Sequence, residues 1–497
     1  MTQAIVSSSV SQHAPVDHLG RPQLPASQGA SLADALDSAH PGVIAAEVSA
    51  WFKAGGRSDG LARGLAAWLA RRDGAALDPC LPAIADGARA AADAEPHRAA
   101  LPWIVAAQLA GERLRTPAEA GVDMAEVVGS CDALGAAVAA RQGAEAQAVA
   151  RAALAAGTDL ATLEAWLLRL AATFPGDGGV AAIAVLKLCD LRAAAGDSGL
   201  EPLYVQMAGA LAQRPEQLAY TRAHAARMAP LLPRLAAMAA AEDPEKQRVF
   251  VEPKFRVHLL GNRPDVAWKA MVKALEFGVP HALLAGSVSL AAAERILRFD
   301  PQHEHDESVV EGWADAGHLM VLASAVRQLR QRLPAAEWLG LLLFAAGLVQ
   351  ASGELDAPES QREPLPEPEA LHQTWDHGPE IAKIVAFLGA GQSQRAMAVL
   401  RGYLLLVLPE QPLCRQLLEA ALAAPIGDPL QAAQAIALMA AAIDEFHALS
   451  QHPDRALPLC AALRVLPAPR LAGQRYRLAL AALDGGVQRH LVGAGPN

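Results

Sequence analysis

The stretch TDLATLEAWLLRLAATFPG, residues 158–176, shows most clearly the pattern that decides the fold. Its leucines recur at spacings of three and four, at Leu160, Leu163, Leu167 and Leu170. Because a helix turns once every ~3.6 residues, this spacing places the four side chains on one helical face. The Pro-Gly pair at 175–176 ends the periodic stretch, since neither residue continues a helix well. The stretch therefore predicts an amphipathic helix.

The same order of helix, short breaker and helix continues along the chain from about Ser31 onward. We expect one helix over 61–72 and another over 117–142, the second ended by Gly143. The apolar run Trp338–Val349 is too short to span a membrane and predicts a buried helix. No run alternates between apolar and polar residues as a strand would, and no repeat of 30–45 residues is present. The sequence predicts an all-α fold, either a multi-helix bundle or an irregular array of stacked helix pairs.

Composition narrows the class of protein further. Of the 497 residues, 53% are apolar and 4% aromatic, which excludes a disordered chain and argues against an all-β protein. The formal charge of -10 argues against nucleic-acid binding, which needs clustered Lys and Arg. Residues 1–10 lack the basic and apolar regions of a secretory signal, and no uncharged apolar run reaches the ~18–20 residues of a membrane span. We therefore expect a cytoplasmic protein with neither nucleic-acid nor membrane partners.

The cysteines do not form a recognisable motif. They are widely scattered, at Cys80, Cys131, Cys189, Cys414 and Cys460. Without a C-x-x-C pair they predict neither a zinc ribbon, nor an iron–sulfur cluster, nor a disulfide framework. We expect them to be small core residues, the usual role of a single cysteine in an apolar helix.

Two shifts in composition indicate boundaries between regions. Residues 240–253 are charged and end in a proline, and residues 356–369 contain four prolines in fourteen positions. The sequence predicts a disordered tail at 1–30, an N-terminal helical region at 31–245, a central helical region at 250–355, a Pro/Glu-rich linker or surface loop at 356–370, and a C-terminal helical region at 371–486.

The densest group of metal-binding residue types is FDPQHEHDESVVEGWADAGH, residues 299–318. Asp315 and His318 are three apart, so they share one helical face, as carboxylate and imidazole ligands do in helical bundles. We expect them to bind a transition metal, iron being the candidate, with a further ligand from the same central region. The candidates for that ligand are His258, His281, His303, His305 and Glu354.

A structural interpretation of these residues stays open beside the metal site. Acidic residues in the first turn of a helix are stabilised by the helix dipole whatever the function. His303 and His305 also fit solvated loop residues, and a helix-flanking histidine such as His281 fits a cap. His318, which precedes an apolar run, also fits a core histidine bonded to a carbonyl.

The usual catalytic motifs, among them G-x-S-x-G, the phosphate loop and H-E-x-x-H, are absent. An Arg-Phe pair at 298–299, Trp313, His318 and an Ala-Ser-Ala-Val run at 323–326 nevertheless follow one another, and a His-Pro pair stands at 452–453. In these features residues 255–486 resemble an uncharacterised bacterial all-helical family that is often fused to, or encoded near, a Rieske 2Fe-2S domain. That family is distantly similar to questin-oxidase-like proteins. The resemblance implies a redox enzyme that receives electrons from an iron–sulfur partner.

The chain departs from the family pattern at three places. Extra residues lie between Phe299 and Trp313, and Pro409–Pro412 stands where the family has an aromatic and histidine cluster. No Rieske ligand set is present in the sequence. These departures put in doubt whether the whole site is retained.

Three functions remain open from the sequence. The first is a metal-dependent oxidoreductase, or a degenerate relative of one, with its site between the helices of residues 255–355 and a redox protein as partner. The alternative is a non-catalytic helical scaffold that binds a protein partner. A helical pocket that binds a small molecule, as in a cofactor-free enzyme, is the third.

Overall fold

The computed structural model describes residues 26–38, 41–71, 77–94, 100–113, 127–214, 219–261, 263–305, 313–371, 377–424 and 429–466. In these ranges the chain forms 22 α-helices and no β-strand, apart from an isolated bridge between Phe299 and Asp356. The prediction of an all-α fold is confirmed. The predicted tail at 1–30 lies mostly outside these ranges, and α1 (Ala26–Asp37) begins within it.

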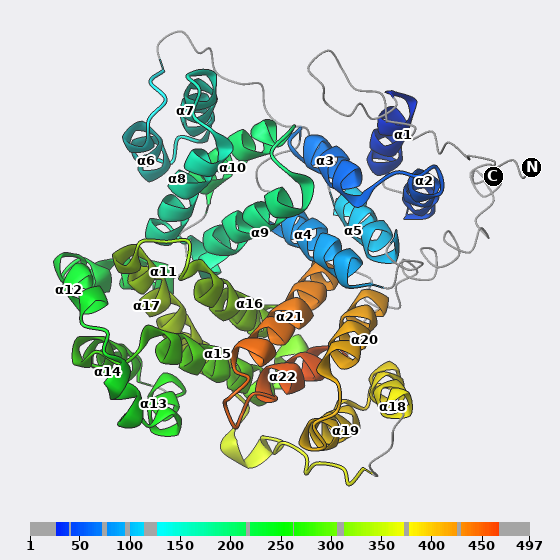
Figure 1. Ribbon diagram of the computed structural model, residues 1–497. Helices are drawn as coiled ribbons and strands as arrows, with labels where there is room; N and C mark the ends of the chain where they lie inside the picture. The colour runs from blue at the N-terminus through cyan, green and yellow to red at the C-terminus, as the bar shows by residue number, and fades with distance from the viewer. Residues whose placement is uncertain are drawn as a thin grey trace, which may run out of the picture.

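Four long helices form the centre of the molecule (Figure 1). They are α4 (Leu77–Asp93), α9 (Val180–Ala195), α16 (Trp313–Leu329) and α21 (Pro429–Ala448). α4 and α16 each pack against both α9 and α21. Their many alanines let the helices approach closely, while the larger apolar side chains Leu81, Leu188, Met320 and Met439 are fully buried.

The remaining helices surround this centre in two groups (Figure 1). The group in the upper half of the view contains α1, α2 (Pro41–Lys53), α3 (Ser58–Leu69), α5 (Ala100–Arg113), α6 (Cys131–Ala139), α7 (Gly143–Ala155), α8 (Leu160–Thr173) and α10 (Glu201–Gln213). The group in the lower half contains α11 (Ala219–Met228), α12 (Leu235–Ala240), α13 (Glu252–Leu259), α14 (Pro264–Phe277), α15 (His281–Arg298), α17 (Ala335–Ala351), α18 (Gly378–Gly389), α19 (Ser393–Leu405), α20 (Glu410–Ala423) and α22 (Leu457–Val465).

One predicted helix agrees closely with the structure and another does not. The helix predicted by the leucine pattern is α8, in which Asp159 Oδ1 accepts a hydrogen bond from the Thr162 N–H at 2.7 Å and caps the first turn. The single helix predicted over 117–142 is wrong, because residues 127–130 are not helical and α6 begins after Ser130. Gly143 starts α7 and does not end the preceding helix.

The apolar run at 338–349 forms the core of α17, as predicted. Residues Ala335–Leu355 are the one helical segment among the described residues that is long and apolar enough to cross a membrane. Most of this segment is buried inside the protein, where α17 packs against α8, α14 and α16. Burial against other helices accounts for its apolar character.

The helices α6–α8 have counterparts of matching order in α18–α20, 250 residues later in the chain. α7 and α8 span 143–155 and 160–173, whereas α19 and α20 span 393–405 and 410–423, a constant shift of 250 residues. Identical residues fall at Gln142/Gln392, Ala146/Ala396, Ala148/Ala398, Val149/Val399, Arg151/Arg401, Leu154/Leu404, Leu163/Leu413, Leu167/Leu417, Leu168/Leu418, Ala171/Ala421 and Pro175/Pro425. We name residues 131–175 repeat 1 and residues 381–425 repeat 2.

The turns inside the two repeats share an unusual backbone conformation. Arg141 and Gly391, after α6 and α18, have φ angles of 59° and 72°, and Gly157 and Val407, after α7 and α19, have φ angles of 94° and 53°. Positive φ angles favour glycine. Arg141 and Val407 nevertheless adopt them, and in each case the matching residue of the other repeat is a glycine. The two segments therefore correspond in helix length, in residue positions and in turn conformation.

The repeats also occupy corresponding places in the fold. Figure 1 shows α6–α8 and α18–α20 at opposite corners of the molecule. α8 packs against the central helix α9, and α20 packs against the central helix α21. The fold is therefore built on two related halves around the four central helices.

Candidate functional site

The structure disperses the predicted metal ligands. His258 is exposed on α13, Asp315 is exposed on α16, and Glu354 is exposed after α17. His303 is half-buried in a short 3-10 turn, with its ring centroid 5.8 Å from that of Phe299. The side chain of His305 and residues 306–312 lie outside the described residues. Among the side chains that the structure describes, no three of His, Cys, Asp and Glu are placed to hold a metal ion.

His318 makes the contact that its structural interpretation predicts. Its Nε2 lies 2.8 Å from the carbonyl oxygen of Gly178, in the turn before α9. This hydrogen bond connects α16 to a glycine turn whose φ angles of 67° at Gly178 and 76° at Gly179 suit glycine. A Cβ at Gly178 would come within 3.2 Å of the imidazole, so the glycine also gives the ring its space.

His281, which is buried, belongs to an ion cluster at the start of α15. Its backbone N–H donates to Glu242 Oε1 at 2.9 Å, and its Nδ1 lies 3.3 Å from Glu242 Oε2. Arg330 also donates to Glu242 at 2.9 Å, and the ring lies beside Trp338. Burial lowers the pKa of His281, against the opposite effect of Glu242. The cluster joins α15 to α16 and to the segment after α12.

A pocket lies between α4, α5, α20 and α21. Its volume is about 480 Å³, which is in the range of small-molecule sites. Much of its lining is apolar, with Ala90, Leu101, Leu418, Leu422 and Ile443 as examples. The polar side chains at its wall are Arg89, Gln411, Cys414, Arg415, Gln416, Glu419 and His447. An apolar cavity with a few polar groups is the usual form of a ligand site.

Cys414 and His447 form a pair at the wall of this pocket. Cys414 lies in α20 between the buried Leu413 and Leu417, and only 6% of its surface is exposed. His447 lies in the last turn of α21 and is exposed. Sγ of Cys414 and Nε2 of His447 are 3.7 Å apart, a hydrogen-bonding distance for sulfur. An imidazole at this distance can accept the thiol proton.

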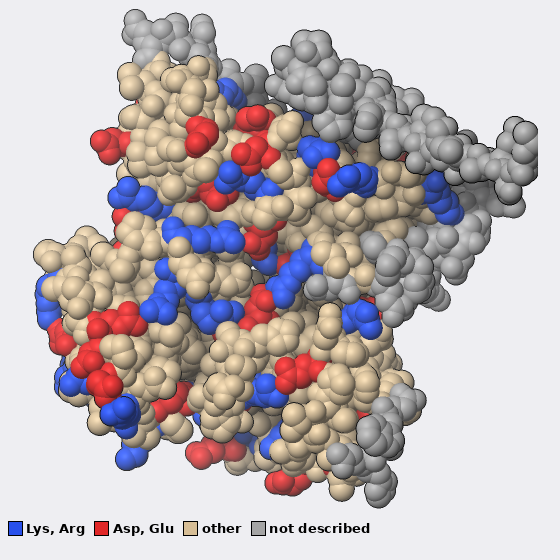
Figure 2. Space-filling model, in the orientation of Figure 1, with Lys and Arg blue, Asp and Glu red and all other residues tan. Residues whose placement is uncertain are grey.

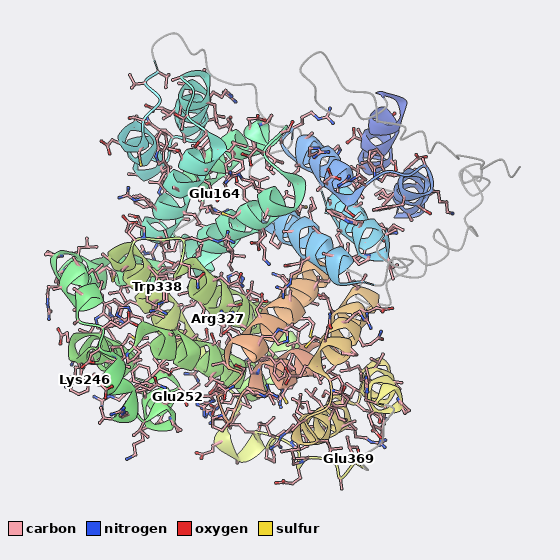
Figure 3. The ribbon with its side chains drawn as sticks, viewed as in Figure 1. Glu164, Lys246, Glu252, Arg327, Trp338 and Glu369 are labelled. Carbon is pink, nitrogen blue, oxygen red and sulfur yellow. The ribbon has the colours of Figure 1, made fainter. Side chains whose placement is uncertain are left out.

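Arg89 is held at the pocket wall by an ion pair with α21. Its guanidinium binds Asp444 through two contacts, of 2.6 and 2.5 Å. Gln328 of α16 donates to the same carboxylate at 3.1 Å. Arg327, labelled in Figure 3, extends the cluster by donating to the buried Glu445 at 2.8 Å. These contacts fix the side of α21 that carries His447.

Further ion pairs lie in the centre of the molecule, between α4 and α9. Lys187 of α9 is paired with the buried Asp86 of α4, and its Nζ lies 3.8 Å from Asp190. Burial acts to lower the pKa of Lys187, but Asp86 and Asp190 outweigh burial and hold this pKa above its usual value. Arg332 of the segment after α16 approaches Asp190 at 3.5 Å. Figure 2 shows charged side chains of both signs at the centre of this face.

Repeat 1 carries different residues at the positions that line the pocket in repeat 2. The residues shifted by 250 from Cys414, Gln416 and Glu419 are Glu164, Trp166 and Arg169. Arg169 Nη2 lies 2.9 Å from Glu337 Oε1 and so ties α8 to α17, which pack directly against each other.

Two further changes separate the repeats at this position. Trp166 is half-buried and packs against the core, whereas Gln416 lines the pocket. Glu164, labelled in Figure 3, accepts a hydrogen bond from the Tyr204 hydroxyl at 2.5 Å. Glu164 and Trp166 thus make hydrogen-bond and core contacts in repeat 1, whereas the residues at the matching positions of repeat 2 line the pocket.

Comparisons of the chain with protein-family models, with curated proteins and with solved structures give no match. The interpretation of the pocket therefore depends on its geometry.

Proposed function

We propose that the protein binds a small, largely apolar molecule in the pocket between α4, α5, α20 and α21. The observation that carries this proposal is the pocket itself. α4 and α5 face α20 and α21 across a volume of about 480 Å³, with apolar side chains on much of its wall. These apolar groups are open to solvent, and covering them with a bound molecule is favourable.

The kind of molecule follows from the lining. Leucine, isoleucine and alanine side chains offer contact to an apolar body. Arg415 and Glu419 are one turn apart on α20 and place polar groups at the pocket wall. A molecule with an apolar body and one polar end matches this arrangement.

The proposal is tested with a variant that gives repeat 2 the residue of repeat 1. Gln416→Trp places an indole where Trp166 stands in repeat 1, and Trp166→Gln is the matched control. The probe is 8-anilinonaphthalene-1-sulfonate, whose fluorescence rises in apolar sites. We expect the natural chain and Trp166→Gln to bind the dye with similar affinity, and Gln416→Trp to lose most of that binding. Equal binding by a folded Gln416→Trp variant would contradict the proposal.

The metal-dependent oxidoreductase stays a prediction. Its site would have to draw ligands from segment 306–312 or from His305, which lie outside the described side chains. Elemental analysis of protein purified without chelator tests it, since a transition metal bound at one equivalent would support it and its absence after reconstitution would exclude it.

The scaffold that binds a protein partner is supported by one surface feature. Large apolar side chains are exposed around α13, at Leu232, Val249, Val251, Val257 and Phe277. Exposed apolar groups in one region are typical of protein interfaces. A chain that stays monomeric, and whose Val251→Asp and Val257→Asp variants retain the same partners as the natural chain, would argue against this function.

A further inference from the structure

The pocket contains a nucleophile whose surroundings differ from those of the other cysteines. Cys189 and Cys460 are buried in the core, where burial raises the pKa of Cys460 to about 12 and the pKa of Cys189 further. Burial also raises the pKa of Cys131 at the start of α6. Cys414 lines the pocket and has the imidazole of His447 at 3.7 Å. A base at this distance assists formation of the thiolate, which is the reactive form of cysteine.

We propose that Cys414 captures a small α,β-unsaturated carbonyl compound in the pocket, with His447 as the base. His447 Nε2 accepts the thiol proton, and Sγ forms a bond to the β-carbon of the bound compound. The π electrons of its carbon–carbon double bond move to the α-carbon, which then takes the proton back from His447. One S–C bond and one C–H bond form, the S–H bond and the π bond break, and no other reactant is needed.

The structure favours this class of compound for two reasons. A thiolate is a soft nucleophile and adds readily to the β-carbon of an enone, and the addition needs only a base and a place for the apolar body. The aliphatic lining beside Cys414, which includes Leu418 and Ile443, supplies that place. The inference rests on the proposed binding function, because the compound must first enter the pocket.

The test uses N-ethylmaleimide, itself an α,β-unsaturated dicarbonyl compound, at one equivalent on the full-length chain. Peptide mass spectrometry then locates the adduct as a function of time. We expect Cys414 to react first, and about tenfold or more faster than Cys131, because general-base assistance commonly accelerates proton transfer by at least that factor. Modification of Cys131 before Cys414 would overturn the proposal.

Three variants separate the steps. Cys414→Ser removes the fast adduct. His447→Gln slows the adduct and moves its pH–rate profile to higher pH, since the thiol must then ionise without the base. Gln416→Trp loses both the adduct and the dye. A natural chain that binds the dye but forms no fast adduct would refute the capture step alone, whereas a chain that does not bind the dye would refute the proposed function. An unchanged rate in His447→Gln would show that the imidazole takes no part.

Discussion

Arg141 and Val407 hold the same backbone conformation in opposite repeats, with φ angles of 59° and 53°, and each has a glycine as its counterpart in the other repeat. Both residues lie at the turn after a helix, where the chain reverses with positive φ. A β-branched side chain is especially disfavoured there, since Cβ approaches the neighbouring backbone. The turn at Val407 therefore keeps the geometry of the matching turn at Gly157 although valine disfavours it.

We expect Val407→Gly to stabilise the protein by about 1 kcal/mol. Relief of the left-handed conformation contributes roughly 1–2 kcal/mol, and the greater freedom of glycine in the unfolded chain offsets roughly 0.5–1 kcal/mol of it. Little packing is lost, because the Val407 side chain is 83% exposed. Urea denaturation measures the change. Gly157→Val, the reverse change in repeat 1, should lower the free energy of unfolding, and a destabilised Val407→Gly variant would contradict the argument.

Because Lys187 and Asp86 form a buried ion pair, we expect each single variant to lower the free energy of unfolding more than the double variant does. Lys187→Met leaves the Asp86 carboxylate, which is 1% exposed, without its cation, and we expect a loss of about 3–5 kcal/mol in the free energy of unfolding. Asp86 Oδ2 already has no hydrogen-bond partner among the described residues, so the carboxylate depends on this lysine. Chemical denaturation measures the loss.

The double variant Asp86→Leu/Lys187→Met supplies the control. Removing both charges avoids the unpaired carboxylate, so its stability should lie nearer to that of the natural chain than either single variant does. Single variants that lose less than the double variant would show that Asp86 and Lys187 are not coupled.

His224 makes the stability of the fold depend on pH. Its ring lies on α11 with centroids 5.0 Å from Phe344 and 5.6 Å from Trp268. Burial, aided by the charge of Arg227, lowers the pKa of His224 to about 4 from 6.5. The unfolded chain therefore binds this proton more readily than the folded chain. As the pH falls from 6.5 to about 4, the free energy of unfolding should decrease by at most roughly 3 kcal/mol.

A variant that cannot titrate isolates this contribution. His224→Phe keeps an aromatic ring in the same surroundings, and urea denaturation between pH 4 and 7 should show a shallower slope than in the natural chain. The slope does not vanish, because burial also lowers the pKa of His281 and of His452. An equal slope in His224→Phe would contradict the assignment.

The sequence predicted the all-α class and helices such as α8, but not every helix boundary and not the surroundings of the candidate site. The leucine spacing of α8 is a local property and predicted its bounds closely. Asp315 and His318 share a helix, but their surroundings depend on distant segments such as Gly178, which local spacing does not reveal. Cys414, expected as a core residue, and His447 meet only because α20 and α21 pack together. Comparison of the two repeats would have indicated Cys414, since Glu164 stands at the matching position.

The proline-rich segment predicted as a linker is tied to the core by Arg295. The guanidinium of this residue, which is 2% exposed, donates to Asp356 Oδ2 at 2.7 Å, to the Val349 carbonyl at 2.9 Å and to the Gln350 carbonyl at 3.3 Å. We expect Arg295→Met to lower the free energy of unfolding by roughly 1.5–3 kcal/mol, because it removes charged hydrogen bonds while Arg298 and Arg362, at 3.8 and 3.5 Å, still compensate part of the Asp356 charge.

The same variant should also change how proteases cut the chain. Residues 356–371 then lose one of their anchors, while the backbone hydrogen bond from the Ala357 N–H to the Arg298 carbonyl remains at 2.7 Å, and limited proteolysis should cleave there sooner than in the natural chain. Arg295→Lys keeps the charge but not the planar fork, so it should give an intermediate stability and an intermediate cleavage rate. Cleavage of Arg295→Met at the natural rate, in a protein that is otherwise destabilised, would show that other contacts hold the segment, such as the hydrogen bond from the Glu369 N–H to the Ala398 carbonyl.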